Sequence, residues 1–169
     1  MRKIILALML LALALGATSA PALAQSETAR ATFFVPATAG GGSEELGGTP
    51  WLAPGLMLKP GTTITVSAAG LWQSCQERSC ATTADGIGVK HVRDCTYIAP
   101  DLSAFSLIAR VGTADPVIVG VGPTTIQGSG ALTFAINDCY FGDNGGGFTV
   151  TVTFPADAVI VNPDADAAA

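Results

Sequence analysis

The sequence is poor in the side chains that catalysis and nucleic-acid binding need. It has one histidine, His91, and 8 lysines and arginines against 13 aspartates and glutamates. The formal net charge of −5 leaves no basic footprint, so a nucleic-acid-binding protein is excluded. Any serine–histidine or cysteine–histidine device would depend on His91, and no G-x-S-x-G motif frames a serine. We therefore expect a protein that is not an enzyme.

Helical periodicity is also missing. No segment after the first 24 residues keeps a 3.6-residue apolar period, and no internal repeat is present. Short alternating apolar runs, punctuated by Gly and Pro, predict an all-β fold: a single jelly-roll or β-sandwich domain over residues 31–155. The expected strands are 31–35, 51–58, 62–72, 105–111, 116–121, 131–136 and 148–154, with a turn at Pro60-Gly61. Residues 25–30 form a polar lead-in, and the acidic, alanine-rich tail 156–169 is expected to be disordered.

Long apolar runs are confined to the start of the chain. A positively charged beginning precedes an apolar run over residues 4–17, and Ala22-Leu23-Ala24 is a small-x-small site that suits signal peptidase. This run is too short for a transmembrane helix, which needs about 20 apolar residues. We expect residues 1–24 to be a signal peptide, no membrane span, and a mature chain that starts at Gln25 in a secreted, periplasmic or extracellular location.

Four cysteines remain in the exported part, which favours two disulfides. A bond between Cys75 and Cys80 would close a local loop, and Cys95 would then reach Cys139, although four cysteines allow three connectivities. The alternative is a zinc site, because Cys75, Cys80, His91 and Cys95 are tetrahedral-type ligands. The oxidising compartment favours the disulfides.

The most informative stretch is a predicted hairpin over residues 131–154. Its strands, 131–136 and 148–154, alternate apolar and polar residues. The loop between them has the sequence NDCYFGDNGGG, with two carboxylates, two amides and four glycines. Asn, Asp and Gly are the residues that turns favour, so a plain turn explains the composition.

A calcium site explains the same loop in a different way. Ca²⁺ takes about six to eight oxygen ligands from carboxylates, amides, carbonyls and water. Asp138 and Asp143 would supply two negative charges, and Asn137 or Asn144 a neutral oxygen. The spacing is not that of an EF-hand. The residues alone leave turn and calcium site as open alternatives.

Two motifs resemble a known family. The loop pattern N-D, D-N, a glycine run and F-T-V resembles the last hairpin of bacterial calcium-dependent galactose-binding lectins. The segment LKPGTTITVSAAGLW, at residues 58–72, resembles their P-G-x-x-I-T-V-x-A-x-G-x-W strand. Asp85-Gly86 and residues 105–112 follow in the expected order, so the resemblance covers residues 51–154. It implies a small galactose-binding-like jelly roll.

The resemblance also implies a ligand set. In that family the first Asp of the loop and a later Asn pair bind calcium, and sugar hydroxyls complete the coordination sphere. The corresponding residues are Asp138, Asp143 and Asn144, of which Asp143 is an Asn in the family pattern. A backbone carbonyl just before the P-G would be that of Leu58. Tyr140 stands near a threonine that contacts metal and sugar, and the loop is about two residues shorter, which leaves the sugar specificity open.

Two functions follow. The first is a calcium-dependent carbohydrate-binding module with a glycan partner, in which Asp138, Tyr140, Asp143 and Asn144 contact both metal and sugar. The second is a non-catalytic structural or adhesive β-sandwich, with a structural calcium ion or none. Aromatic residues at 72, 97 and 140 would either stack on a sugar or fill the core. Assembly into a homo-oligomer stays open.

Overall fold

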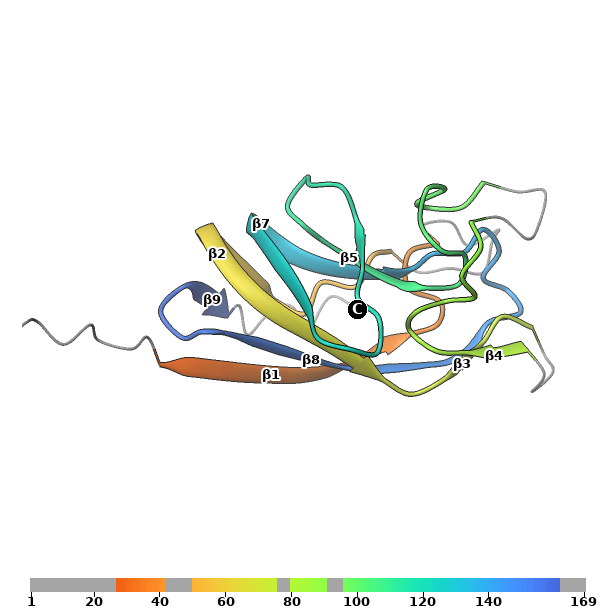
Figure 1. Cartoon of the computed structure of the whole chain (residues 1–169), viewed down its shortest axis with the longest axis horizontal. Helices are drawn as coiled ribbons and strands as arrows, with labels where there is room; N and C mark the ends of the chain where they lie inside the picture. Colours follow the sequence, from red (N-terminus) through yellow and green to blue (C-terminus); the bar gives the residue numbers. More distant parts are fainter. Residues whose placement is uncertain (1–26, 42–49, 76–79, 91–95, 162–169) are drawn as a thin grey trace, which may run out of the picture.

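The computed structural model describes residues 27–41, 50–75, 80–90 and 96–161 (Figure 1). This part of the chain contains nine strands and no α-helix, which confirms the all-β prediction. The strands are β1 (Thr28–Pro36), β2 (Leu56–Ala69), β3 (Trp72–Gln73), β4 (Ala81–Thr82), β5 (Leu107–Val111), β6 (Val117–Ile118), β7 (Thr124–Ile136), β8 (Gly145–Pro155) and β9 (Val159–Val161). Within the same residues no helix is long and apolar enough to cross a membrane. The predicted signal peptide, 1–24, lies outside them.

The strands form one curled antiparallel sheet that folds into two layers (Figure 1). The order is β4-β3-β8-β2-β7-β5-β6, with β1 on the other side of β8 and β9 paired to β2. Strand β2 belongs to both layers, because it pairs with β7 up to Val66 and with β8 from Thr65 onward. The layers therefore make a β-sandwich that is joined along one strand.

A bulge in β2 replaces the turn predicted at Pro60-Gly61. The register between β2 and β7 shifts between Leu58 and Thr62, and Gly61 has a φ of 77°. A bulge bends a strand and increases its twist, and glycine adopts a positive φ without steric cost. The prediction of a turn was wrong because both sides of the dipeptide continue in the same sheet.

The core lies between the layers and follows the alternation of the hairpin strands. The inward residues of β8, from Phe148 to Phe154, are buried, while the threonines between them face outward. Phe134 of β7 packs against Phe33 of β1 with ring centroids 5.2 Å apart. Each fully buried large apolar side chain contributes about 1.5–3 kcal/mol. This core fixes the ends of β7 and β8, and so the loop between them.

The sheet extends beyond its predicted limits. Strand β7 begins at Thr124, because its first half pairs with β2. Strand β9 lies within the segment predicted as a disordered tail, and pairs with residues 56–58 of β2. That prediction was wrong at β9, where a short apolar run finds an open strand edge. Residues 162–169 lie outside the described chain.

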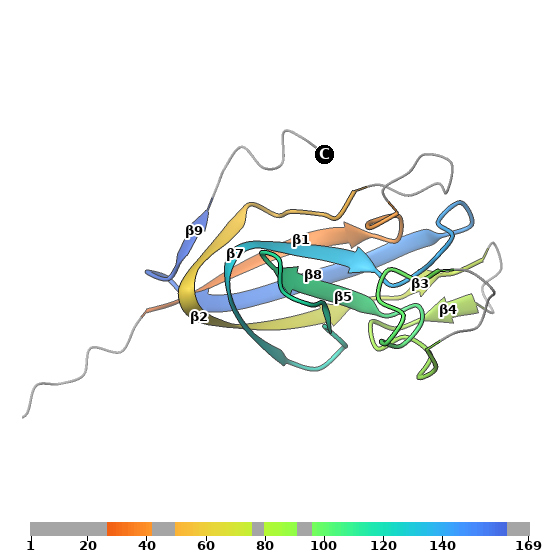
Figure 2. The same ribbon diagram turned by 90° about the horizontal axis from the view of Figure 1, so that it is seen from above.

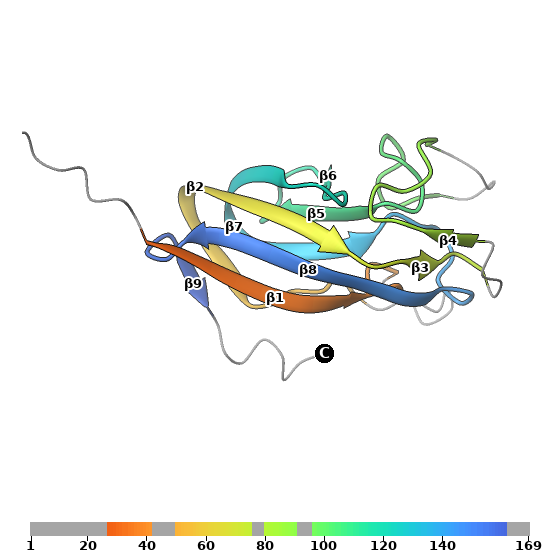
Figure 3. The same cartoon turned by 60° about the horizontal axis from the view of Figure 1, so that its bottom comes forward.

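The loop between β7 and β8 lies at one end of the sandwich. Figures 2 and 3 show the loop between β7 and β8 at the same end as β3 and β4. Strand β9 and the turn that follows β8 lie at the opposite end. The loop thus has a short two-stranded extension of the sheet beside it.

Candidate metal and ligand site

The loop of residues 137–144 is held on both sides where β8 begins. Gly145 pairs with Gln73 and Gly146 with Trp72, so β3 adjoins one edge of β8. On the other edge, the amide of Ala37 donates to the carbonyl of Gly146 at 3.0 Å. The loop therefore starts and ends on ordered strands.

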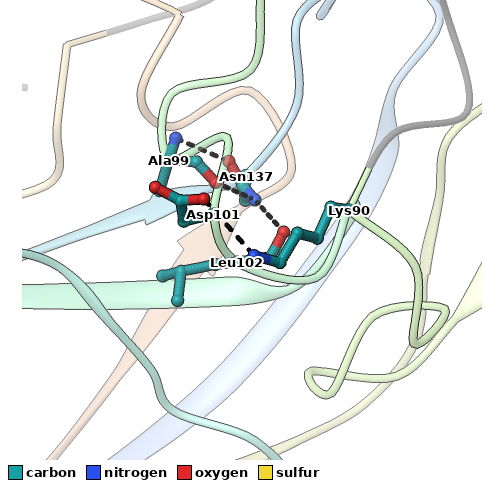
Figure 4. A network of polar contacts seen from close by, with 5 residues as sticks. All are labelled: Lys90, Ala99, Asp101, Leu102 and Asn137. Atoms are coloured by element: carbon teal, nitrogen blue, oxygen red, sulfur yellow. Dashed lines mark hydrogen bonds and ion pairs between the residues drawn. The ribbon is translucent and has the colours of Figure 1, made fainter.

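Asn137 is a structural brace. Its side chain is fully buried, and its Oδ1 accepts a hydrogen bond from the amide of Ala99 at 2.8 Å. Its Nδ2 donates to the carbonyls of Ala99 and Ser103 at 3.0 and 2.9 Å. Figure 4 shows how this amide lies against the loop that follows Ala99. These bonds use both hydrogens and one lone pair of the oxygen, so Asn137 holds the fold together and is a weaker candidate than Asn144 for the neutral metal ligand.

Asp138 is a fully buried carboxylate at the start of the loop. Its Oδ1 accepts a hydrogen bond from the amide of Cys139 at 2.7 Å, and its Oδ2 is buried as well. A buried charge is costly unless hydrogen bonds and opposite charge compensate for it. The local amide supplies part of this compensation, and a cation at Oδ2 would add to it.

The far shoulder of the loop is less buried. The amide of Asn144 donates to the carbonyl of Phe141 at 3.2 Å, which closes a turn, and its Nδ2 donates to the carbonyl of Ala37 at 2.9 Å. The Oδ1 atoms of Asp143 and Asn144 are buried. None of the described residues donates a hydrogen bond to Oδ1 of Asn144. Leaving such an oxygen unsatisfied costs about 1–3 kcal/mol, so this atom suits a cation.

The structure does not bring Leu58 to this loop. Leu58 pairs with Gly130 of β7 and with Val159 of β9. From Gly130, strand β7 runs on to Ile136, about 20 Å farther at the usual rise per residue. Leu58 therefore lies near the opposite end of the sandwich, and its assignment as a metal ligand was wrong.

The aromatic residues separate into core and surface. Trp72 and Tyr97 are buried, and both rings pack edge-on against Phe105, with centroids 5.7 and 6.0 Å away. The Nε1 of Trp72 donates to the carbonyl of Phe105 at 2.9 Å. Tyr140 is 44% exposed, and its ring lies across Gly142. Tyr140 alone of the three is placed to meet a ligand at the loop.

Comparisons with known proteins identify the family of the chain and support the fold. The family model of the PA-IL-like proteins matches residues 49–156, which include the whole loop. The chain belongs to the PA-IL-like protein family. The fold is similar to a solved structure titled "EclA N-terminal domain; PllA-like lectin", with 26% identity over 73% of this chain and 94% of that chain, and a TM-score of 0.51. No curated protein matched. The family resemblance found in the sequence is confirmed.

The oxygens of this PA-IL-like loop fit calcium better than zinc. In the described residues, no three His, Cys, Asp or Glu side chains gather as a metal site. The loop offers two carboxylates and an amide, so further ligands would be carbonyls, water or a bound molecule. Calcium accepts this mixture of oxygens, whereas structural zinc prefers four nitrogen and sulfur ligands.

The disulfide bonds of the cysteines also argue against a zinc site. Cys75 and Cys80 form a disulfide with their Cα atoms 5.7 Å apart, which confirms that predicted bond and removes two of the proposed zinc ligands. Cys139 is disulfide-bonded too. Its predicted partner, Cys95, lies outside the described residues, as does His91, so this second pairing stays a prediction.

A hollow that no sequence pattern predicted lies beside the loop. It has a volume of about 410 Å³ and is lined by Leu71, Gln73, Ala81, Gly145 and Gly146. Its walls come from β3, β4 and the start of β8. Because β3 and β4 have two residues each, no periodic pattern marks them as strands.

Proposed function

We propose that this PA-IL-like protein is an exported, calcium-dependent lectin that binds galactose-type sugars. The observation that carries the proposal is the buried Oδ1 of Asn144, which receives no hydrogen bond from the described residues and lies in a loop that the family match covers. The family and the fold support a binding protein rather than an enzyme.

Three side chains of the loop would hold the ion. Asp138 and Asp143 would contribute charge, and Asn144 a neutral oxygen. Bound calcium supplies positive charge and open coordination positions that suit a pair of vicinal hydroxyls. Asn137 keeps Asp138 in place through its bonds to Ala99 and Ser103. Exposed at the rim, Tyr140 offers a ring face and a hydroxyl to the sugar.

The proposed location rests on the leader and on the disulfide. Residues 1–24 have the pattern of a signal peptide. The bond between Cys75 and Cys80 suits an oxidising compartment outside the cytoplasm. Intact-mass analysis of exported protein should give a chain that begins at Gln25, and exported protein that retains Met1 would contradict the leader.

A structural role is the second candidate, and one observation favours it. The Oδ1 of Asp138 already accepts hydrogen bonds from the amide of Cys139 and, at 3.5 Å, from that of Tyr140, and the second bond is that of an ordinary Asx turn. In that case calcium would only tie the loop together, and no sugar would bind.

A glycan array separates the two candidates. The mature protein should bind galactose-terminated glycans in the presence of calcium. This binding should disappear when a chelator is added and return when calcium is restored. Binding that persists in chelator would contradict calcium dependence. Absence of binding to every glycan, with the protein folded and calcium present, would leave the structural role.

A further inference from the structure

The hollow beside the loop lies on the outer face of β3, β4 and β8. Gly145 follows Asn144 directly in the chain, so the hollow begins one residue from a proposed metal ligand. At 3.8 Å between consecutive Cα atoms, the two regions adjoin. The hollow is therefore close enough to the loop to receive the next unit of a ligand that binds there.

Small residues flank the hollow on both sides of Gln73. In the register of the short strands, Gln73 pairs with Ala81 on one side and with Gly145 on the other. Side chains alternate along a strand, and that of Trp72 faces the core, so those of Leu71 and Gln73 face outward. Leu71 is 58% exposed. The neighbours of Gln73 are too small to cover this face.

The glycine at 145 is not required by the backbone. The two glycines that follow it are required. Gly146 has a φ of 81°, which disfavours other residues, and a Cβ on Gly147 would clash with the carbonyl oxygen of Val35 at 2.3 Å. Gly145 is outside the left-handed region, and among the described residues a Cβ there would meet only Oε1 of Gln73, at 3.8 Å. Its effect is to keep the hollow open.

We propose that this hollow is a second subsite, which holds the next sugar unit of a glycan whose terminal sugar binds at the calcium loop. Leu71 offers an apolar surface to the C–H face of a sugar ring, and the amide of Gln73 offers a donor and an acceptor to hydroxyls. The described residues of the lining include no charged side chain, which suits a neutral sugar. Its volume lies within the range of small-molecule sites.

This inference rests on the proposed function, so its test compares matched sugars. Calorimetry in calcium would measure the Kd of the two methyl galactosides, α and β, and of the corresponding disaccharides, melibiose and lactose. At least one disaccharide should bind the parent about fivefold more tightly than its methyl galactoside, because it fills the second subsite.

Two variants and a control test whether the hollow causes the tighter binding of the disaccharide. Gly145→Val should fill the hollow, and Gln73→Ala should remove its hydrogen-bonding group. Both should lose the disaccharide gain, with the Kd for the methyl galactosides unchanged within about twofold. Gly122→Val is the control, because a Cβ there meets no atom within 4 Å and Gly122 does not line the hollow. It should behave like the parent.

The outcomes are distinct. Equal affinity of the parent for methyl galactosides and disaccharides would overturn the subsite alone, and so would a gain that survives in both Gly145→Val and Gln73→Ala. A folded parent that binds neither kind of sugar in calcium would overturn the lectin function as well.

Discussion

The two shoulders of the loop use similar side chains for different purposes. Asn137 and Asp138 are fully buried, and the amide group of Asn137 is occupied by hydrogen bonds to a distant segment. Asp143 and Asn144 are half-buried, and Asn144 makes one side-chain bond, to Ala37, while its Oδ1 has no donor among the described residues. An amide whose atoms are all paired braces the fold, whereas an amide with a spare buried oxygen is available to a ligand.

The largest expected effect is that of Asn137→Ala on folding. The change removes three side-chain hydrogen bonds and leaves the amide of Ala99 without its acceptor, and should lower the free energy of unfolding by about 3 kcal/mol. Asn144→Ala, the same substitution on the other shoulder, should cost about 1 kcal/mol without calcium. Denaturant melts in chelator measure both. Equal losses would remove the distinction between the two shoulders.

The next effect is the loss of calcium stabilisation in Asp138→Asn. An ion that binds only the folded parent stabilises it by about 2.7 kcal/mol at a hundredfold excess over Kd. That is roughly several degrees in Tm. The variant should lose most of this increment, because it removes a charge and retains a residue that suits a turn.

An exposed carboxylate provides the control for that variant. Asp101 has a 95% exposed side chain, and pairs with Lys90 at 3.3 Å in the ion pair drawn in Figure 4. Such exposed pairs contribute about 0–1 kcal/mol, so Asp101→Asn should keep the calcium response. If Asp138→Asn and the parent respond alike, the loop is an ordinary turn.

A smaller effect is expected at Asn144, and it concerns affinity. Asn144→Ala removes a proposed ligand oxygen and should raise the Kd for calcium about tenfold, which corresponds to about 1.4 kcal/mol of binding free energy. Asn144→Asp keeps an oxygen there and should retain calcium, although it loses the bond that Nδ2 donates to Ala37. Calcium titrations of the three proteins measure this. An unchanged affinity in Asn144→Ala would exclude Asn144 as a ligand.

The smallest effect is that of magnesium. Mg²⁺ requires shorter, near-octahedral contacts and gives up its water reluctantly. At equal concentration it should raise Tm far less than calcium does. An equal response to both ions would indicate unspecific screening of the carboxylates.

Alternation of side chains was enough to predict the central strands, because one face of each is buried. It failed where pairing decides the structure. A P-G dipeptide suits both a turn and a bulge, and only the partner strands show that Gly61 lies in a bulge of β2. Strand β9 exists because the beginning of β2 offers it an edge, and its three residues are too few to show a period.

The candidate site was predictable in part. The composition of the loop offered Asp138, Asp143 and either Asn137 or Asn144 as ligands, and the resemblance favoured Asn144; these assignments stay predictions. Leu58 was a wrong choice because its position depends on the β2–β7 register. The role of Asn137 was not predictable, since its partners follow residue 98 and meet it only in the folded chain. Long-range contacts, rather than residue types, distinguish Asn137 from the proposed ligand Asn144.

The most direct test of shared metal and sugar binding is a calorimetric calcium titration of the mature protein, with and without a saturating methyl galactoside. If sugar hydroxyls complete the coordination sphere, bound sugar must raise the affinity for calcium by the same factor by which bound calcium raises the affinity for the sugar. We predict one calcium ion per chain, bound more tightly in the presence of the sugar. Calcium binding that ignores the sugar, or no calcium binding at all, would contradict the account.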